Sequence, residues 1–453
     1  MRHKVTRCIA RIFVLAIGIG LLTSPPATFA QCSAGQGNNV VYGYCGPHNS
    51  FATEGSGAFI DASMFVANVT NPDLCSVLNY VLLNKVPRTG ALIDARGLPN
   101  VTGVSMSCSI TPWSGITNPP ASTILLPAGT IISPGIWILP PGTHLIGEGD
   151  SIGSGTTIQA GSTFSATAGP IIQFCSSACS DVSVERVNLD GFGGPINGIV
   201  NSFAGEGSFV DHVSLYQIRG TGLTVSGSPT NTAATNSGPY SNITFDTGNY
   251  AGATTTVCAQ ITGLTGTRGI RRLRCTSESS DANAAVQLDS SNNTIQDVMV
   301  SGFHDGVLVG ANAVAKTNVL RNIVGDTANT CYPTCITPIN TVHISNHTTG
   351  GSANVADLSI MGGSNDGNGT YTIADDLTGT TLPDSYTGLY ALGEPVSGGY
   401  TRLTTSANAA TWVSGTTSTL SGTCPQGSIY SCISSSCTNT LWACTSGGWV
   451  LVK

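Results

Sequence analysis

A pattern of apolar and polar positions recurs through the middle of the chain. Each copy has an apolar residue, two polar residues, an apolar residue, a residue of any type and a final apolar residue. Clear copies lie at residues 184–189, 210–215, 270–275 and 295–300, a shorter copy at 320–323, and looser copies at 241–245 and 356–360. The central apolar position falls, in steps of 25 to 35 residues, at Val187, Val213, Ile243, Leu273, Val298, Ile323 and Leu358. Such steps are typical of solenoids, whose units bury their apolar faces against one another.

A second short strand follows the pattern in most units. These strands are predicted at residues 198–200, 222–225, 285–288 and 306–309. Their apolar residues alternate with a period of about two, which is typical of strands with one face inward. Strands joined by short polar turns, coil after coil, predict an all-β fold, a parallel β-helix.

The second of the two polar positions indicates a tight corner in each coil. Its occupants are Arg186, His212, Asn242, Arg272, Asp297, Asn322 and Asp357. Asn, Asp and His tolerate a left-handed backbone conformation better than other residues do. The pair Asp211-His212 is therefore interpreted first as part of a turn, with catalysis as the alternative.

A solenoid needs a cap at each open end. Residues 72–86 have helical spacing of apolar residues, with Asn71 as the expected N-cap and Pro72 as the first helical residue. This helix is predicted to close the first coil. Residues 91–96 then begin the first strand, and residues 123–160 hold further early coils.

Five segments follow along the chain. A basic start, an apolar run at 12–22 and small residues up to Ala30 predict a signal peptide cut after Ala30, with an uncleaved anchor as the alternative. We assign 1–30 to the signal peptide, 31–90 to an N-terminal segment and capping helix, 91–381 to the β-helix, 382–417 to a C-terminal cap and 418–453 to a small β module rich in Cys and Trp. In that module, Trp442 and Trp449 form either a sugar-stacking surface or a small core clamped by disulfides.

Composition and charge exclude some partners. Only 9% of the residues are charged, but recurrent Val, Ile and Leu exclude disorder. After the signal, 13 basic and 24 acidic residues remain, a net charge of 13 − 24 = −11. This balance argues against a nucleic-acid partner. The mature chain is expected to be secreted, outside the cell, at its surface or in the periplasm, and not bound to a membrane.

Fourteen cysteines remain after the signal, an even number that predicts disulfides in an exported protein. We expect local loop staples at Cys175/Cys179 and Cys331/Cys335, and longer ties at Cys75/Cys108 and Cys258/Cys275. Four cysteines of the tail are expected to close it on itself, with a zinc site as the alternative: Cys424, Cys432, Cys437 and Cys444.

Residues 91–97, 124–129 and 139–149 resemble the N-terminal coils of the pectate-lyase superfamily, in which a strand-Pro-x-Gly turn precedes a strand ending in Gly-x-Gly. With the repeats, the resemblance covers about residues 55–380. It implies a right-handed parallel β-helix that acts on a polysaccharide. Such folds also serve as hydrolases, epimerases, tailspikes and adhesins.

The motifs of two active families are only partly present. The segment Asn188-Leu189-Asp190 is similar to the Asn-x-Asp motif of polygalacturonase-like hydrolases, but Gly-His-Gly is missing. Residues 209–212 are similar to the Trp-Ile-Asp-His strand of calcium-type pectate lyases, but Arg-x-Pro-x-x-Arg is missing. Calcium is therefore left open as a cofactor, and no other cofactor is predicted.

Candidate catalytic carboxylates come from the repeat register. That register aligns Asp190, Tyr216 and Asp246 on successive coils, which places the two carboxylates roughly 9.6 Å apart with Tyr216 between them. An inverting glycosidase needs two carboxyls about 6.5–9.5 Å apart. The alternative is two ordinary turn aspartates.

Three further groups could carry chemistry. Arg271, Arg272 and Arg274 could bind sugar carboxylates, or could pair with acids of neighbouring coils, Arg271 with Asp211 or Arg272 with Asp297. His304 and Asp305 form a plausible acid–base pair or a tight turn.

Two functions of different classes remain. The first is a polysaccharide lyase or glycoside hydrolase acting on an acidic, pectin-like polysaccharide, with catalytic candidates Asp190, Asp246, Asp211, His304 and Asp305 and substrate-binding candidates Arg271, Arg272, Arg274 and Tyr216. The second is a non-catalytic glycan-binding, adhesin or structural protein. A sugar epimerase is a weaker third. An oligomer, such as a trimer formed through the C-terminal region, is left open.

Overall fold

The computed structural model describes residues 58–326 with short gaps, and several segments outside this range. The gaps lie at 152, 163, 165–168, 178–179, 228–236, 249–255, 266, 278–282 and 314. The other described segments are 40–41, 44–45, 340–344, 355–357, 361–363, 371–375, 385–387, 412–415, 429–432 and 441–452. The predicted signal peptide and the pair Cys331/Cys335 lie outside the described residues. No helix within the described ranges is long and apolar enough to cross a membrane.

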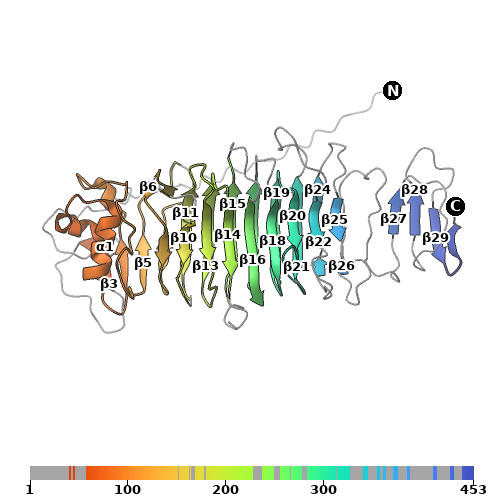
Figure 1. Ribbon diagram of the computed structural model, residues 1–453, viewed down its shortest axis with the longest axis horizontal. Coiled ribbons are helices and arrows are strands. Elements are labelled where there is room, and N and C mark those ends of the chain that lie inside the picture. The colour runs from red at the N-terminus through yellow and green to blue at the C-terminus, as the bar shows by residue number, and fades with distance from the viewer. Residues whose placement is uncertain are drawn as a thin grey trace, which may run out of the picture. The chain divides into compact units, whose positions relative to one another are not determined.

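Two long sheets of parallel strands form the body of the protein (Figure 1). The nine-stranded sheet contains β7 (Trp137–Leu139), β10 (Pro170–Phe174), β12 (Asn197–Asn201), β14 (Thr221–Ser226), β16 (Val257–Thr265), β18 (Ala284–Ser291), β20 (Asp305–Val309), β22 (Asn340–Ile344) and β25 (Tyr371–Asp375). Each strand pairs with the strand one coil before and one coil after it, which makes the fold a parallel β-helix, as predicted.

The fifteen-stranded sheet runs along the other faces of the same coils. Its main path contains β3 (Ala58–Asp61), β4 (Ala91–Asp94), β5 (Ser122–Leu125), β8 (His144–Ile146), β11 (Ser183–Asp190), β13 (Phe209–Tyr216), β15 (Tyr240–Asp246), β17 (Ile270–Thr276), β19 (Thr294–Ser301), β21 (Val319–Asp326), β23 (Val355–Asp357) and β26 (Ser385–Thr387). Three short strands pair beside this path: β6 (Gly129–Ser133), β9 (Thr156–Ala160) and β24 (Met361–Gly363).

The predicted register of the repeats is confirmed over six coils. Central apolar residues pair in one continuous column: Val187, Val213, Ile243, Leu273, Val298 and Ile323. The next expected member, Leu358, lies outside the described residues. Because a parallel ladder spaces neighbouring strands by about 4.8 Å, each column places equivalent side chains one coil apart along the helix axis.

The predicted corner is also confirmed as a left-handed bend inside each long strand. Six residues of this column have φ between 50° and 57°: Arg186, His212, Asn242, Arg272, Asp297 and Asn322. The bend shifts the inward–outward alternation, so that Val184 and Val187 are both fully buried although they are three residues apart. This shift explains why the sequence pattern has two polar residues between its first apolar positions.

The capping helix α1 (Leu74–Asn84) begins later than predicted. Its N-cap is Asp73 and not Asn71, because the Asp73 carboxylate accepts a hydrogen bond from Ser76 N at 2.8 Å while Ser76 Oγ accepts one from Asp73 N at 2.9 Å. This reciprocal capping box satisfies two of the free N–H groups at the helix start. The apolar face of the helix is buried as expected. Two short 3-10 helices flank it, η1 (Ala62–Asn68) and η2 (Leu98–Asn100).

Three predicted boundaries differ from the structure. The parallel sheet begins before the capping helix, since β3 pairs with β4, and the sequence Ala-Phe-Ile-Asp of β3 matches Ala-Leu-Ile-Asp of β4. The sheet also continues beyond residue 381, since β26 pairs with β23. Finally, β27 (Trp412–Gly415), from the predicted cap, pairs with β28 (Ile429–Cys432) of the predicted tail module.

The tail sheet contains β27, β28, β29 (Leu441–Thr445) and β30 (Gly448–Leu451). Tyr430 and Trp442 are buried there, and Trp449 packs against them, which confirms the interpretation as a small core. Cys432 and Cys444 are both disulfide-bonded, so neither supplies a thiolate to a zinc ion. The N-terminal unit, residues 1–49, holds the pair β1 (Val40–Val41) and β2 (Tyr44–Cys45).

Two of the predicted disulfides are confirmed. Cys75 of α1 is bonded to Cys108, and Cys258 of β16 is bonded to Cys275 of β17. The second bond ties the two sheets together inside the helix, where both cysteines are fully buried. Cys175 is disulfide-bonded as well.

Candidate functional site

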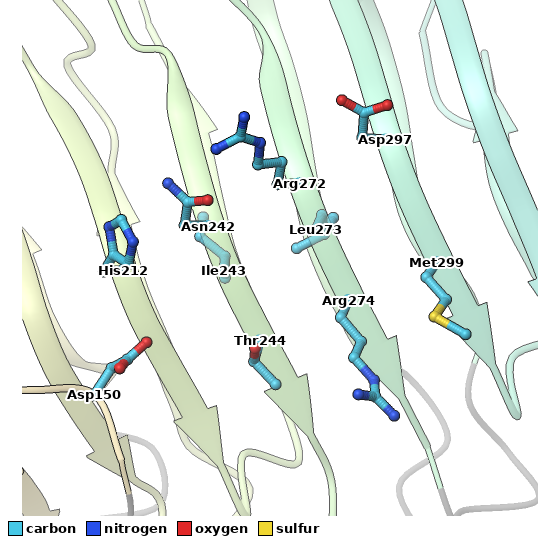
Figure 2. Close-up of a pocket in the computed structure, with 10 residues that line it drawn as sticks. All are labelled: Asp150, His212, Asn242, Ile243, Thr244, Arg272, Leu273, Arg274, Asp297 and Met299. Carbon is cyan, nitrogen blue, oxygen red and sulfur yellow. The ribbon is translucent and has the colours of Figure 1, made fainter. Parts of the chain in front are cut away.

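An open groove of about 410 Å³ lies on the outer surface of four successive coils. Figure 2 shows all but one of its side chains on neighbouring strands, which are β13, β15, β17 and β19; Asp150 comes from the segment between β8 and β9. The lining residues are Asp150, His212, Asn242, Ile243, Thr244, Arg272, Leu273, Arg274, Asp297 and Met299. Because the groove crosses the strands, it runs along the helix axis for three coil spacings, roughly 14 Å.

Two columns of the repeat supply most of the lining. The first is the bend column, in which the left-handed backbone turns His212, Asn242, Arg272 and Asp297 outward. The second stands two residues after the bend, where Thr244 pairs with Arg274 and Arg274 pairs with Met299. These positions alternate with buried apolar residues of the core, so their side chains must point to solvent.

His212 is held by the carboxylate of Asp211. Its Nδ1 lies 2.8 Å from Asp211 Oδ2, so Nδ1 donates to the carboxylate and Nε2 takes no part in this hydrogen bond. Asp211 Oδ1 also accepts hydrogen bonds from Ser241 Oγ at 2.6 Å and from Asn242 Nδ2 at 2.7 Å. Partial burial raises the pKa of the Asp211 carboxyl, but these hydrogen bonds and the neighbouring histidine lower the pKa by more. Asp211 therefore stays ionised and orients the imidazole.

Arg271 is not ion-paired with Asp211, nor Arg272 with Asp297, although all four residues are described, which corrects one sequence-based alternative. Asp297 accepts from Asn322 Nδ2 at 2.8 Å, and Asp211 is bound to its own neighbours. Among the described residues, no carboxylate lies within 4.0 Å of the guanidinium groups of the predicted substrate-binding arginines, which are Arg271, Arg272 and Arg274. Each of these acids instead accepts from an amide of the next coil, Asp211 from Asn242 and Asp297 from Asn322.

The bend separates the three arginines. Arg272 and Arg274 line the groove, whereas Arg271 stands before the bend and is not among the lining residues. All three are exposed. In Figure 2 the Arg272 guanidinium extends toward Asn242 and away from Asp297. Two guanidinium groups of one coil are therefore available to a ligand in the groove.

The column of Asp190, Tyr216 and Asp246 has the predicted register. However, each aspartate has a local hydrogen-bonding role. Asp190 accepts from Phe192 N at 2.8 Å and from Gln159 Nε2 at 2.7 Å, and Asp246 accepts from Gly248 N at 2.8 Å. These bonds to the residue two positions later are typical of Asx turns. None of the column's three residues lines the groove.

His304 and Asp305 are joined by a residue that the sequence analysis did not select. Asp305 Oδ2 lies 3.2 Å from His304 Nδ1 and 3.1 Å from Nδ1 of His343, which comes from the next coil. The Asp305 side chain is 3% exposed, whereas the histidines are 30% and 23% exposed. The carboxylate thus orients two imidazoles on the sheet that does not carry the groove.

One cluster in the described part of the chain has the spacing of metal ligands, at Asp73, Cys75 and Cys108. Its two cysteines form a disulfide, and Asp73 caps α1, so these residues do not offer a thiolate site. Several lining residues were missed as site candidates by sequence reasoning: Asp150, Asn242, Thr244, Asp297 and Met299. The bend column contained the signal for Asn242 and Asp297, whereas His212 was considered there with catalysis as the alternative to a turn.

Comparison with known proteins identifies no family for this chain. No protein-family model and no curated protein matches the chain. A solved structure from Geobacillus virus E2, ORF18, is 13% identical, with a TM-score of 0.33, and covers 76% of this chain. The chain spans 63% of the length of that viral protein. The A-module of the mannuronan C-5 epimerase AlgE4 of Azotobacter vinelandii is 13% identical, with a TM-score of 0.20, over 61% of this chain and 91% of that module. The resemblance to the pectate-lyase superfamily stays a prediction.

Proposed function

We propose that the protein is a secreted lyase or hydrolase of an acidic polysaccharide, and that the glycan lies in the groove across the coils. The observation that carries this proposal is the pair Arg272 and Arg274, two exposed guanidinium groups on one coil with no acid within 4.0 Å among the described residues. A guanidinium fork suits a sugar carboxylate, and such charge-assisted hydrogen bonds contribute about 1.5–3 kcal/mol each.

His212 is the group in the groove best placed to transfer a proton. Asp211 holds the imidazole through Nδ1, so that in the neutral imidazole Nε2 would be the atom that acts as general base. In a lyase reaction, Nε2 would take the proton from the carbon next to the carboxylate. The electron pair of that C–H bond would form the double bond while the glycosidic C–O bond breaks, and the leaving oxygen would take a proton from solvent. Arg272, whose guanidinium extends toward Asn242 on the coil between β17 and β13 (Figure 2), is the arginine that would hold the carboxylate on the His212 side and make that proton more acidic.

A hydrolase would use other groups. Asp190 and Asp246 remain the carboxylate pair for an inverting reaction, with Tyr216 on the coil between them, although they lie outside the groove. The pair His304-Asp305, now with His343, is the second acid–base candidate. Calcium would add a positive charge beside the substrate carboxylate in the lyase case, and its requirement is part of the test.

The experiment incubates the purified mature protein with polyuronates and neutral glycans, with and without calcium. Unsaturated products are measured by ultraviolet absorbance, and chain cleavage by a reducing-end assay. New absorbance supports the lyase and predicts its loss in His212→Asn. That substitution is suitable because asparagine tolerates the left-handed bend. Reducing ends without absorbance support the hydrolase, and Asp190→Asn and Asp246→Asn follow.

Two arginine variants test the binding step. We expect Arg272→Asn and Arg274→Gln each to weaken glycan binding by tenfold or more, since tenfold corresponds to about 1.4 kcal/mol. Arg186→Asn is the matched control, because Arg186 occupies the same bend column outside the groove. If both groove variants bind as tightly as the wild type while the glycan is still cleaved, the groove is not the binding site.

A non-catalytic glycan-binding role is the second candidate, and one observation favours it. The two aspartates of the predicted catalytic pair cap turns, and neither of them lines the groove. A folded protein that binds an acidic glycan through the groove but yields neither new absorbance nor reducing ends would establish that role.

A further inference from the structure

We infer that the groove recognises one carboxylate flanked by neutral sugars, so that the preferred glycan carries spaced acidic residues and not consecutive ones. This inference rests on the proposed function and names the substrate class of the same site. It follows from how charge is distributed over the four coils.

Positive charge in the groove comes from a single coil. The bend column presents His212, Asn242, Arg272 and Asp297 on successive strands. The column two residues after the bend presents Thr244, Arg274 and Met299 on β15, β17 and β19. Both arginines of the groove therefore lie on β17, where their guanidinium groups extend in different directions (Figure 2).

The coil after β17 disfavours a second carboxylate. Asp297 is half-buried on β19, is held by Asn322 Nδ2 at 2.8 Å, and has no cation within 4.0 Å among the described residues. Its partner in the other column is Met299, whose side chain is 48% exposed. An apolar side chain beside a carboxylate suits the C–H face and the hydroxyls of a neutral sugar, not another anion.

The coils before β17 are neutral or balanced. On β15 the groove offers the amide of Asn242 and the hydroxyl of Thr244, which are hydrogen-bonding partners for sugar hydroxyls. On β13, His212 is accompanied at 2.8 Å by the ionised Asp211, and Asp150 lines the same end of the groove. A run of consecutive carboxylates would thus meet acidic groups at both ends of the groove.

The length scale makes this distinction sharp. Neighbouring coils are about 4.8 Å apart, so a linear glycan that runs along the axis presents successive sugars to successive coils. A homopolyuronate places a carboxylate on every sugar, whereas the groove offers guanidinium groups at one coil only. A heteroglycan with isolated uronates matches this arrangement.

The test compares binding of the mature protein to four probes by titration calorimetry. They are polygalacturonate, a linear heteroglycan with one glucuronate in each tetrasaccharide repeat, the same heteroglycan after carboxyl reduction, and a neutral-backbone glycan with pendant pyruvate ketals. We expect the heteroglycan to bind at least tenfold more tightly per carboxylate than polygalacturonate, and carboxyl reduction to abolish binding. Binding of the ketal glycan instead would assign the isolated carboxylate to a pendant group.

Asp297→Asn tests whether the charge of this residue disfavours a second carboxylate in the groove. Asparagine keeps the bend, and we expect it to strengthen polygalacturonate binding by threefold or more and so to lower the ratio of heteroglycan to polygalacturonate affinity. Arg186→Asn should change neither. Equal or tighter binding of polygalacturonate by the wild type overturns this inference but leaves the proposed function standing. A protein with the circular dichroism of a folded β-helix that binds no probe overturns both.

Discussion

The left-handed bend column permits a sharp test of what holds each coil in shape. Arg186 occupies this column with φ of 56°, its side chain is exposed, and it lies outside the groove. A left-handed conformation costs an ordinary L residue roughly 1–2 kcal/mol, asparagine less, and a β-branched residue more. We therefore expect Arg186→Asn to raise the free energy of unfolding by up to about 1 kcal/mol, and Arg186→Val to lower it by about 1 kcal/mol or more.

The assay is equilibrium unfolding in denaturant, followed by circular dichroism. Ser214 gives the opposite control, because it is an outward-facing strand position in β13 and strands favour valine over asparagine by up to about 1 kcal/mol. The valine variant should thus have a higher free energy of unfolding than the asparagine variant at position 214 and a lower one at position 186. If valine and asparagine rank in the same order at both positions, the bend is not under the conformational constraint inferred here.

Three further predictions concern the interior and the groove. Burial raises the pKa of Tyr240 to about 12. Because an unfolded tyrosine ionises near pH 10, the free energy of unfolding should fall by roughly 3 kcal/mol between pH 10 and pH 12. Denaturant unfolding of Tyr240→Phe should not show this pH dependence. The pKa of Asp211 is lower in the folded protein than the value near 4 of an unfolded aspartate, so its ionised carboxylate stabilises the fold above about pH 4. This part of the free energy of unfolding should be lost on acidification of the wild type, and Asp211→Asn should lack it at every pH. Replacing Cys258 and Cys275 by serine removes a disulfide that spans 17 residues and should lower the free energy of unfolding in denaturant by about 3 kcal/mol. An unchanged free energy of unfolding would show that this disulfide does not stabilise the fold.

The candidate site was only partly predictable. The arginines and Asp211 stood out because basic residues are few and because Asp211 precedes a bend histidine. His212, Asn242 and Asp297 were assigned to the bend and not to the groove, although the same left-handed backbone that makes the corner also turns their side chains outward. A turn residue and a site residue are not alternatives in this fold.

The sequence by itself determined the coil: the register of six repeats, the bend column, two disulfides and the apolar face of the capping helix. These follow from local patterns, since each repeat must shift its alternation at the same point to bury residues on both sides of a corner. Only the tertiary structure decided what meets across coils. Asn242, 31 residues away, binds Asp211, and His343, 38 residues away, reaches Asp305. Arg274, after the bend, lines the groove, whereas Arg271, before the bend, does not. Such contacts depend on connection lengths and side-chain packing between coils, which no repeat pattern encodes.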